Sequence, residues 1–236
     1  MRALTRSLLI AAALLLLIAG CGGSEAGRAT SHQPAGPLTE RQLAARLLTP
    51  SDLPFDFFKS RDDREHGADA HAHSPGCQRI LRGDGDDAAA RAEVLYENGG
   101  PPVSGDDGGA YRDLLLRESL FSDKPDNVER DFAAMRRALD RCRHVTITGT
   151  GFRAPMTLRP ESFADLGDET LAYALRGRFI TADTTVPASG QLVGVRVANA
   201  RAVLFTFGLG RRSGTDIAAV TRSALRRLTS GRPAAG

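Results

Sequence analysis

The chain has 236 residues, of which 42% are hydrophobic and 25% charged, as in an ordinary globular protein. Its formal net charge of +3 includes Arg2 and Arg6, which lie in an N-terminal segment that we expect to be removed. The remaining 29 basic and 28 acidic side chains nearly balance, so no basic stripe is indicated and we expect no nucleic-acid partner.

The first 20 residues have the layout of a bacterial secretory signal. Arg2 and Arg6 give a positive start, and an apolar run of 11 residues follows from Leu8 to Ile18. That run is short for a membrane span, which needs roughly 20 residues. The order Ile18-Ala19-Gly20-Cys21 resembles the lipobox of bacterial lipoproteins, where cleavage leaves the cysteine first and acyl chains such as palmitate are attached to it. We expect a signal peptide over 1–20 and a lipidated Cys21; the alternatives are an ordinary secretory signal and an uncleaved anchor.

Residues 21–37 are expected to form a lipidated cysteine and a flexible tether. Gly22–Pro37 is rich in Gly, Ser, Ala and Pro and has almost no large apolar residue, so it cannot bury enough surface to order itself. A flexible chain of this length would hold the next domain roughly 20–25 Å from its anchor. The expected location is therefore the outer face of the cell membrane, with the membrane as a partner through the lipid.

The first half of the folded part, expected over 38–231, combines helices and strands. Thr39 to Gln42 has capping-box spacing and predicts a helix start. A short helix is expected around Cys77 to Leu81. Ala89 to Glu97 is typical of a strand, and Tyr111 to Phe121 is open between helix and strand, with alternating leucines that favour a strand. The clearest helix is 126–142, which has an apolar stripe at helical spacing: Val128, Phe132, Met135, Leu139 and Cys142.

The second half is mostly strands. They are expected over 145–148, 152–158, 170–181, 192–197 and 201–207. Ala198-Asn199 is a plausible tight turn because Asn tolerates positive φ. A final helix, capped by Thr215, would turn inward Ile217, Val220, Thr221, Ala224 and Leu228. Gly231 and Pro233 would end it before a disordered tail over 232–236.

This order predicts a single α+β domain, in which an antiparallel sheet packs with helices on one side. One disulfide is expected within it. If Cys21 is lipidated, Cys77 and Cys142 remain as an even pair in an oxidising compartment. Two free thiols are the alternative.

No pattern in the sequence indicates a catalytic site. The segment with His66, His71 and His73 is a weak candidate for Zn²⁺ or Cu²⁺, and a solvated loop is favoured over it. Asp84, Asp86 and Asp87 lack the later glutamate of a calcium loop. Nucleophile elbows, phosphate-binding loops and zinc-protease motifs are absent from the sequence. The presence of both Ser119 and His144 does not by itself indicate a serine hydrolase. We therefore expect no enzyme and no cofactor, although Glu118, Glu161 and Glu169 could pair in three dimensions.

Several short motifs occur in a suggestive order. They are the lipobox, the tether, Leu47-Leu48-Thr49-Pro50-Ser51-Asp52-Leu53-Pro54, Pro75-Gly76-Cys77, Glu118-Ser119-Leu120-Phe121, Arg141-Cys142-Arg143 and Leu166-Gly167-Asp168-Glu169. Over residues 38–229 the chain resembles the actinobacterial secreted or lipid-anchored relatives of the extracellular sensor domain of mycobacterial PknH-type receptor kinases. The resemblance implies an α+β domain with a groove for a ligand at the cell surface, and no individual ligand residues.

We expect, accordingly, a lipid-anchored binding domain for a small apolar or amphipathic ligand, such as a lipid, or for an envelope protein partner. The alternatives are a structural or accessory envelope protein that acts by protein contact and, after it, an enzyme with an unrecognised site.

Overall fold

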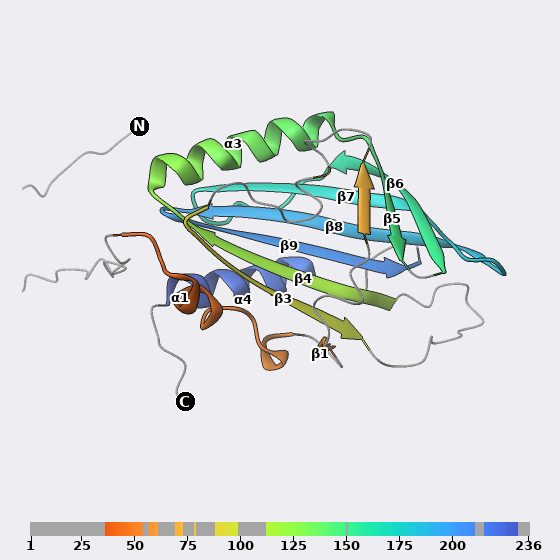
Figure 1. The fold of residues 1–236 in the computed structure, drawn as a ribbon, viewed down its shortest axis with the longest axis horizontal. Coiled ribbons are helices and arrows are strands. Elements are labelled where there is room, and N and C mark those ends of the chain that lie inside the picture. Colours follow the sequence, from red (N-terminus) through yellow and green to blue (C-terminus); the bar gives the residue numbers. More distant parts are fainter. Residues whose placement is uncertain are drawn as a thin grey trace, which may run out of the picture. The chain divides into compact units, whose positions relative to one another are not determined.

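A long antiparallel sheet forms the centre of the structure (Figure 1). The computed structural model describes residues 36–53, 57–60, 69–72, 78, 88–98, 112–149, 151–210 and 215–230, all within the compact unit His32–Gly236. Nine strands in these residues pair in the order β1-β3-β4-β9-β8-β7-β6-β5-β2. Their bounds are β1 Phe57–Lys59, β2 Asp69–Ala72, β3 Ala90–Asn98, β4 Arg112–Ser122, β5 His144–Gly149, β6 Phe152–Pro160, β7 Glu169–Ile180, β8 Thr185–Val197 and β9 Ala200–Leu209.

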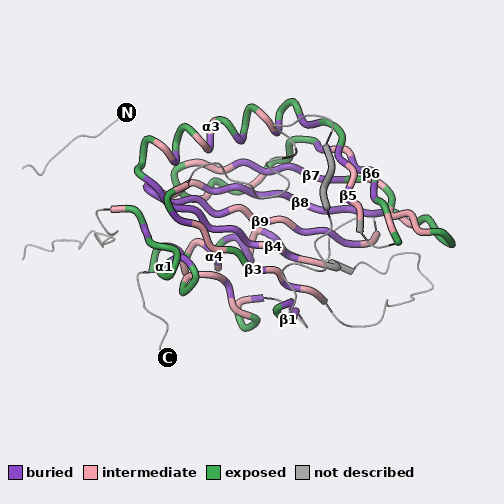
Figure 2. The backbone as a smooth tube through the Cα atoms, viewed as in Figure 1, coloured by how far each residue is buried: buried purple, intermediate pink, exposed green. Residues whose placement is uncertain are grey.

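The sheet has a hydrophobic core on each face, because side chains alternate along a strand. On β8, Val193 and Val195 belong to one core cluster, whereas Leu192, the residue just before Val193, belongs to the other. We call the first face A and the second face B. Buried segments run along the central strands (Figure 2).

Face A is covered over β3, β4, β9 and β8 by helices α1 (Glu40–Ala44), η1 (Pro50–Asp52) and α4 (Ile217–Thr229). The predicted capping box at α1 is confirmed: Thr39 and Gln42 cap each other's backbone N–H groups. The predicted inward residues of α4 are all buried: Ile217, Val220, Thr221, Ala224 and Leu228. Its cap is Asp216 rather than the predicted Thr215, because the Asp216 carboxylate accepts the Ala219 N–H at 3.0 Å.

Face B is covered by α3 (Pro125–Arg141), which lies along β5 to β9 (Figure 1). Its predicted stripe is confirmed, since Val128, Phe132, Met135 and Leu139 are buried and Cys142 follows at the buried C-cap. Gly194 on β8 lies under this helix, where a Cβ would approach the Met135 methyl group to 2.9 Å. The close packing of α3 therefore depends on the missing side chain.

The predicted tight turn joins β8 to β9, but its special backbone position is Ala198, with φ of +46°. The Asp168 carboxylate accepts the Ala198 N–H at 2.6 Å and helps to hold this conformation. Asn199 is buried, and its side-chain amide donates to the Gly36 carbonyl oxygen. The polar residue of this turn thus fastens the start of the domain instead of supplying the positive φ.

The predicted fold class is wrong. The described structure is mainly β: the sheet extends through the whole unit, and helices cover parts of both faces rather than one side. The three predicted helices suggested a single layer on one side of the sheet. However, β8 and β9 have buried residues on both faces, so each face of these strands must be covered by other elements. The disulfide predicted between Cys77 and Cys142 is described at one end alone: Cys142, the one cysteine among the described residues, is disulfide-bonded, and Cys77 lies outside them.

Candidate functional site

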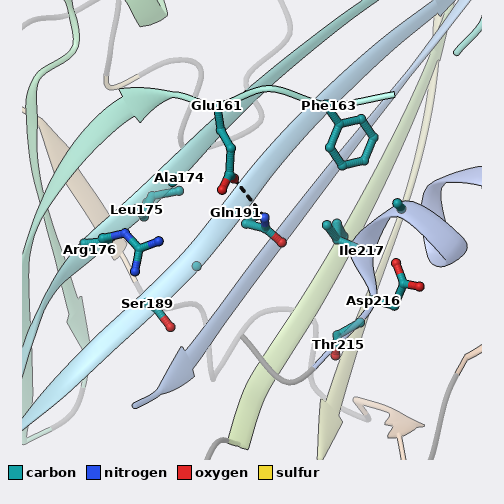
Figure 3. Close-up of a pocket in the computed structure, with 12 residues that line it drawn as sticks. Glu161, Phe163, Ala174, Leu175, Arg176, Ser189, Gln191, Thr215, Asp216 and Ile217 are labelled. Atoms are coloured by element: carbon teal, nitrogen blue, oxygen red, sulfur yellow. Dashed lines mark hydrogen bonds between the residues drawn. The ribbon is translucent and has the colours of Figure 1, made fainter. Parts of the chain in front are cut away.

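A pocket opens on face A where α4 begins, above strands β7 and β8 (Figure 3). Its volume of about 470 Å³ lies within the range of sites that hold small molecules. The lining comprises Glu161, Phe163, Ala174, Leu175, Arg176, Ser189, Gly190, Gln191, Thr215, Asp216, Ile217 and Ala218. These residues are far apart in sequence, and the sheet register brings them together.

The strand pattern explains why this part of face A is polar. Along β8, Val193 and Val195 pack under the helices, and the preceding positions on the same face are Gln191 and Ser189. Gln191 pairs with Ala174 of β7, and Ser189 pairs with Arg176. The apolar core of face A therefore gives way to a polar floor at the first turn of α4.

Hydrogen bonds hold several of these groups in place. The Gln191 side-chain amide donates to the Glu161 carboxylate at 2.8 Å, and the Gln191 backbone N–H donates to Thr206 Oγ1 at 3.1 Å. On the helix side, Asp216 is fixed by its capping bond. Phe163 and the buried Ile217 supply apolar surface beside them (Figure 3). The pocket combines oriented polar groups with an apolar wall, which suits an amphipathic molecule.

Ser189 is the unusual member of this floor. It is 4% exposed, and its hydroxyl oxygen, which is closed to solvent in this conformation, has no hydrogen-bond partner among the described residues. A buried hydroxyl without a partner costs on the order of 1–3 kcal/mol. Because Ser189 lines the pocket, a change of its side-chain rotamer that exposes the hydroxyl would allow a ligand or a water molecule to complete its bonding.

A second polar cluster lies beneath α1 and η1 and connects the N-terminal segment to the sheet. Glu118 of β4 is fully buried, and its carboxyl Oε2 accepts the Leu48 N–H at 2.7 Å. The Tyr96 hydroxyl donates to the carbonyl oxygen of the same Leu48. Nearby, Arg227 of α4 pairs with Asp52 at 3.2 Å. Burial raises the pKa of Glu118 to about 8, although the Leu48 bond and Arg227 act in the opposite direction.

This cluster fixes the N-terminal segment to the sheet, a structural role that we call the fastening. Burial likewise raises the pKa of Tyr96 to about 12, with the charge of Glu118 as a further cause. Both side chains bind the two polar backbone groups of Leu48, so they fix the chain between α1 and η1 on the sheet. No pocket that we describe reaches them.

The structure does not bring the predicted chemical residues together. Cys21, Cys77, His66, His73, Asp84, Asp86 and Asp87 lie outside the described residues, and of His71 only the backbone is described, in β2. The described part of the chain contains no group of three or more metal-ligating side chains.

The remaining candidates are separated by the sheet. Ser119 on β4 and His144 on β5 have four strands between them, about 24 Å at the usual strand spacing. Glu118 bonds to Leu48, Glu161 to Gln191, and Glu169 to Arg136 and Arg196, so each carboxylate has a different partner.

Sequence reasoning missed the pocket residues Ser189, Gln191 and Arg176. The available signal was the polar segment Ser189-Gly190-Gln191, which directly precedes the apolar end of β8 and could have indicated a polar site on that strand. Its meaning depends on what lies opposite, which only the register with β7 and the position of α4 reveal.

Within the described residues, no helix has the length and apolar character that a bilayer span requires.

Comparisons with known proteins bear on the fold. No family model and no curated protein sequence matches the chain. Among solved structures, the extracellular domain of PknH from Mycobacterium tuberculosis superposes with a TM-score of 0.50 at 14% sequence identity. The match covers 82% of this chain and 96% of that domain. The predicted resemblance is thereby supported at the level of the fold, which this chain shares with the extracellular domain of PknH.

Proposed function

We propose that this chain is a sensor-like binding domain, held at the outer face of the membrane by a lipid on Cys21. It binds a small amphipathic molecule in the pocket between β7, β8 and the start of α4. The location is supported by the lipobox-like sequence and by the shared fold with an extracellular domain. The single observation that carries the binding function is the buried, unpartnered Ser189 hydroxyl in the pocket.

The pocket chemistry supports this ligand class. Ser189, Gln191 and Arg176 offer hydrogen-bond donors on the strand side. Phe163 and Ile217 offer apolar contact on the opposite side (Figure 3). A ligand with a polar head and a short apolar part satisfies both sides.

The test is native mass spectrometry of the full chain purified from its host, combined with Ser189→Ala. The wild-type chain should carry a bound small molecule, and the variant should retain several-fold less of it, because one good hydrogen bond of about 1 kcal/mol corresponds to roughly fivefold in affinity. Without ligand, Ser189→Ala should be as stable as the wild type or more stable, since it removes an unpartnered polar group.

Ser119→Ala is the matched control. Ser119 is also a buried serine in a strand, but its hydroxyl donates to Glu93 at 2.8 Å and lies away from the pocket. This variant should lose stability and keep the ligand. A wild-type chain that carries nothing, or ligand loss in Ser119→Ala equal to that in Ser189→Ala, would contradict the assignment and favour the accessory, protein-contact alternative.

A further inference from the structure

No helix in the described part of the chain covers face A over β5, β6 and β7, beyond the strands that α1 and α4 cover. The alternate residues Ala154, Met156 and Leu158 of β6 point to the α3 side and are buried. Arg153 and Arg159, which lie just before and just after these residues and point to the opposite face, are exposed. The open part of face A is therefore a solvent-facing sheet surface.

This surface is basic. Arg153 and Arg159 of β6 and Arg176 and Arg178 of β7 are all exposed on it, and the exposed His144 of β5 lies on the same face, opposite Thr157. We call these five residues the arginine face. Neighbouring strands lie about 4.8 Å apart and same-face residues about 7 Å apart along a strand, so the cations are close neighbours.

Acidic side chains are few beside this charge: Glu161 and Asp216 line the pocket next to Arg176, where Glu161 accepts from Gln191 and Asp216 caps α4. Strands β5, β6 and β7 contain a single acidic residue, Glu169, and it pairs with Arg136 of α3 on face B. Arg153, Arg159 and Arg178 form no ion pair with any described residue. A chain whose acids and bases nearly balance thus concentrates positive charge on one face.

We propose that the arginine face docks on an anionic phospholipid bilayer and orients the domain on the membrane. Charge complementarity is the first argument, since cations near an anionic lipid surface each raise partitioning roughly fivefold. The second is the covalent reach of the chain: the 16 residues of Gly22–Pro37 span at most about 55 Å when extended. A domain tethered at Cys21 can therefore lay this face on the surface that holds it. Contact would be electrostatic, because no large apolar side chain is exposed on these described strands.

The proposal goes beyond the pocket and does not depend on its ligand. Arg176 also lines the pocket, so its protection is counted only as the difference between anionic and neutral vesicles, which a pocket ligand leaves unchanged. It uses the Cys21 anchor only for proximity, and the two can be separated experimentally. The full chain is mixed with vesicles of phosphatidylcholine alone, or of phosphatidylcholine and phosphatidylglycerol in equal parts. Co-flotation with the neutral vesicles reports the anchor, whereas docking is read from arginine modification.

Docking is measured by phenylglyoxal modification of individual arginines, followed by mass spectrometry. We expect Arg153, Arg159 and Arg178 to be protected on anionic vesicles and not on neutral ones, with protection lost at high salt. The exposed Arg130 and Arg137 of α3 and Arg222 of α4 are internal controls that should react equally on both.

A triple variant sharpens the test. Arg153→Gln, Arg159→Gln and Arg178→Gln together should lower the docked fraction on the order of 100-fold, at roughly fivefold per cation, so that the remaining Arg176 loses its protection. The same three substitutions at Arg130, Arg137 and Arg222 remove equal charge and should leave Arg176 protected. Equal modification on both vesicles, or equal protection of the helix arginines, would overturn the proposal. Protection by soluble polyphosphate that matches or exceeds protection by anionic vesicles would also overturn it, in favour of a soluble polyanion.

Discussion

Glu118→Gln should remove a large pH dependence of stability. The wild-type carboxyl group is fully buried, and burial raises its pKa from 4.5 to about 8. The folded chain therefore prefers the protonated form, whereas the unfolded chain releases the proton near pH 4.5. The stability contributed by this group is fully present below that pH and is lost as the pH rises through about 8.

The size of the effect follows from the same shift. Each tenfold change in proton affinity is worth about 1.4 kcal/mol, so the free energy of unfolding should fall by about 5 kcal/mol between pH 4.5 and pH 8.5, and by about 3 kcal/mol at pH 7. Glutamine has the same shape, keeps an oxygen for the Leu48 N–H, and cannot ionise. Its variant should lack this loss and be the more stable protein at neutral and alkaline pH.

The assay is chemical denaturation of both proteins across this pH range, read as the difference in the free energy of unfolding between them. The difference cancels the other titrating groups. Glu129→Gln, the same substitution at an exposed position of α3, is the control and should follow the wild type. If the wild type and Glu118→Gln lose stability in parallel, the carboxyl group is not held in a dry site, and the account of the fastening beneath α1 is wrong.

Two further predictions concern the anchor and the core. Cys21→Ser should move the chain from the membrane fraction to the soluble fraction on cell fractionation, because the attachment site of the acyl chains is gone; retention in the membrane would contradict lipidation. Leu139→Ala, at a 1% exposed position of α3, should lower the free energy of unfolding by about 2–5 kcal/mol in a denaturant titration. Arg137→Ala on the exposed side of the same helix should change the free energy of unfolding by less than about 0.5 kcal/mol. Equal losses of stability in the two variants would contradict the packing of α3 on the sheet through its Leu139 side.

Much of the secondary structure was predictable because its signals are local. The stripe of α3 and the inward residues of α4 follow from helical periodicity, and the predicted strands of the second half correspond to β5 to β9. The fold class was not predictable in the same way. Whether a helix covers one face of a sheet or the other depends on the register of strands such as β4 and β9, whose paired residues are 78 to 97 positions apart in sequence.

The candidate site was hidden for the same reason. Glu161, Arg176, Ser189 and Asp216 form no motif, and each is an ordinary polar residue at the position where it occurs. Net charge was similarly uninformative about the surface, since a near balance of charges over the chain conceals four arginines on one sheet face. Long-range pairing creates both features, and periodicity in one strand does not report it.

The central claim is that the pocket beside α4 holds a small molecule. Its most direct test is a crystal structure of the full chain purified from its host without added ligand. The account predicts density for an amphipathic molecule in the pocket, with a polar atom within hydrogen-bond distance of Ser189 Oγ. A pocket that contains only solvent, or a bound molecule that leaves Ser189 without a partner, would contradict it.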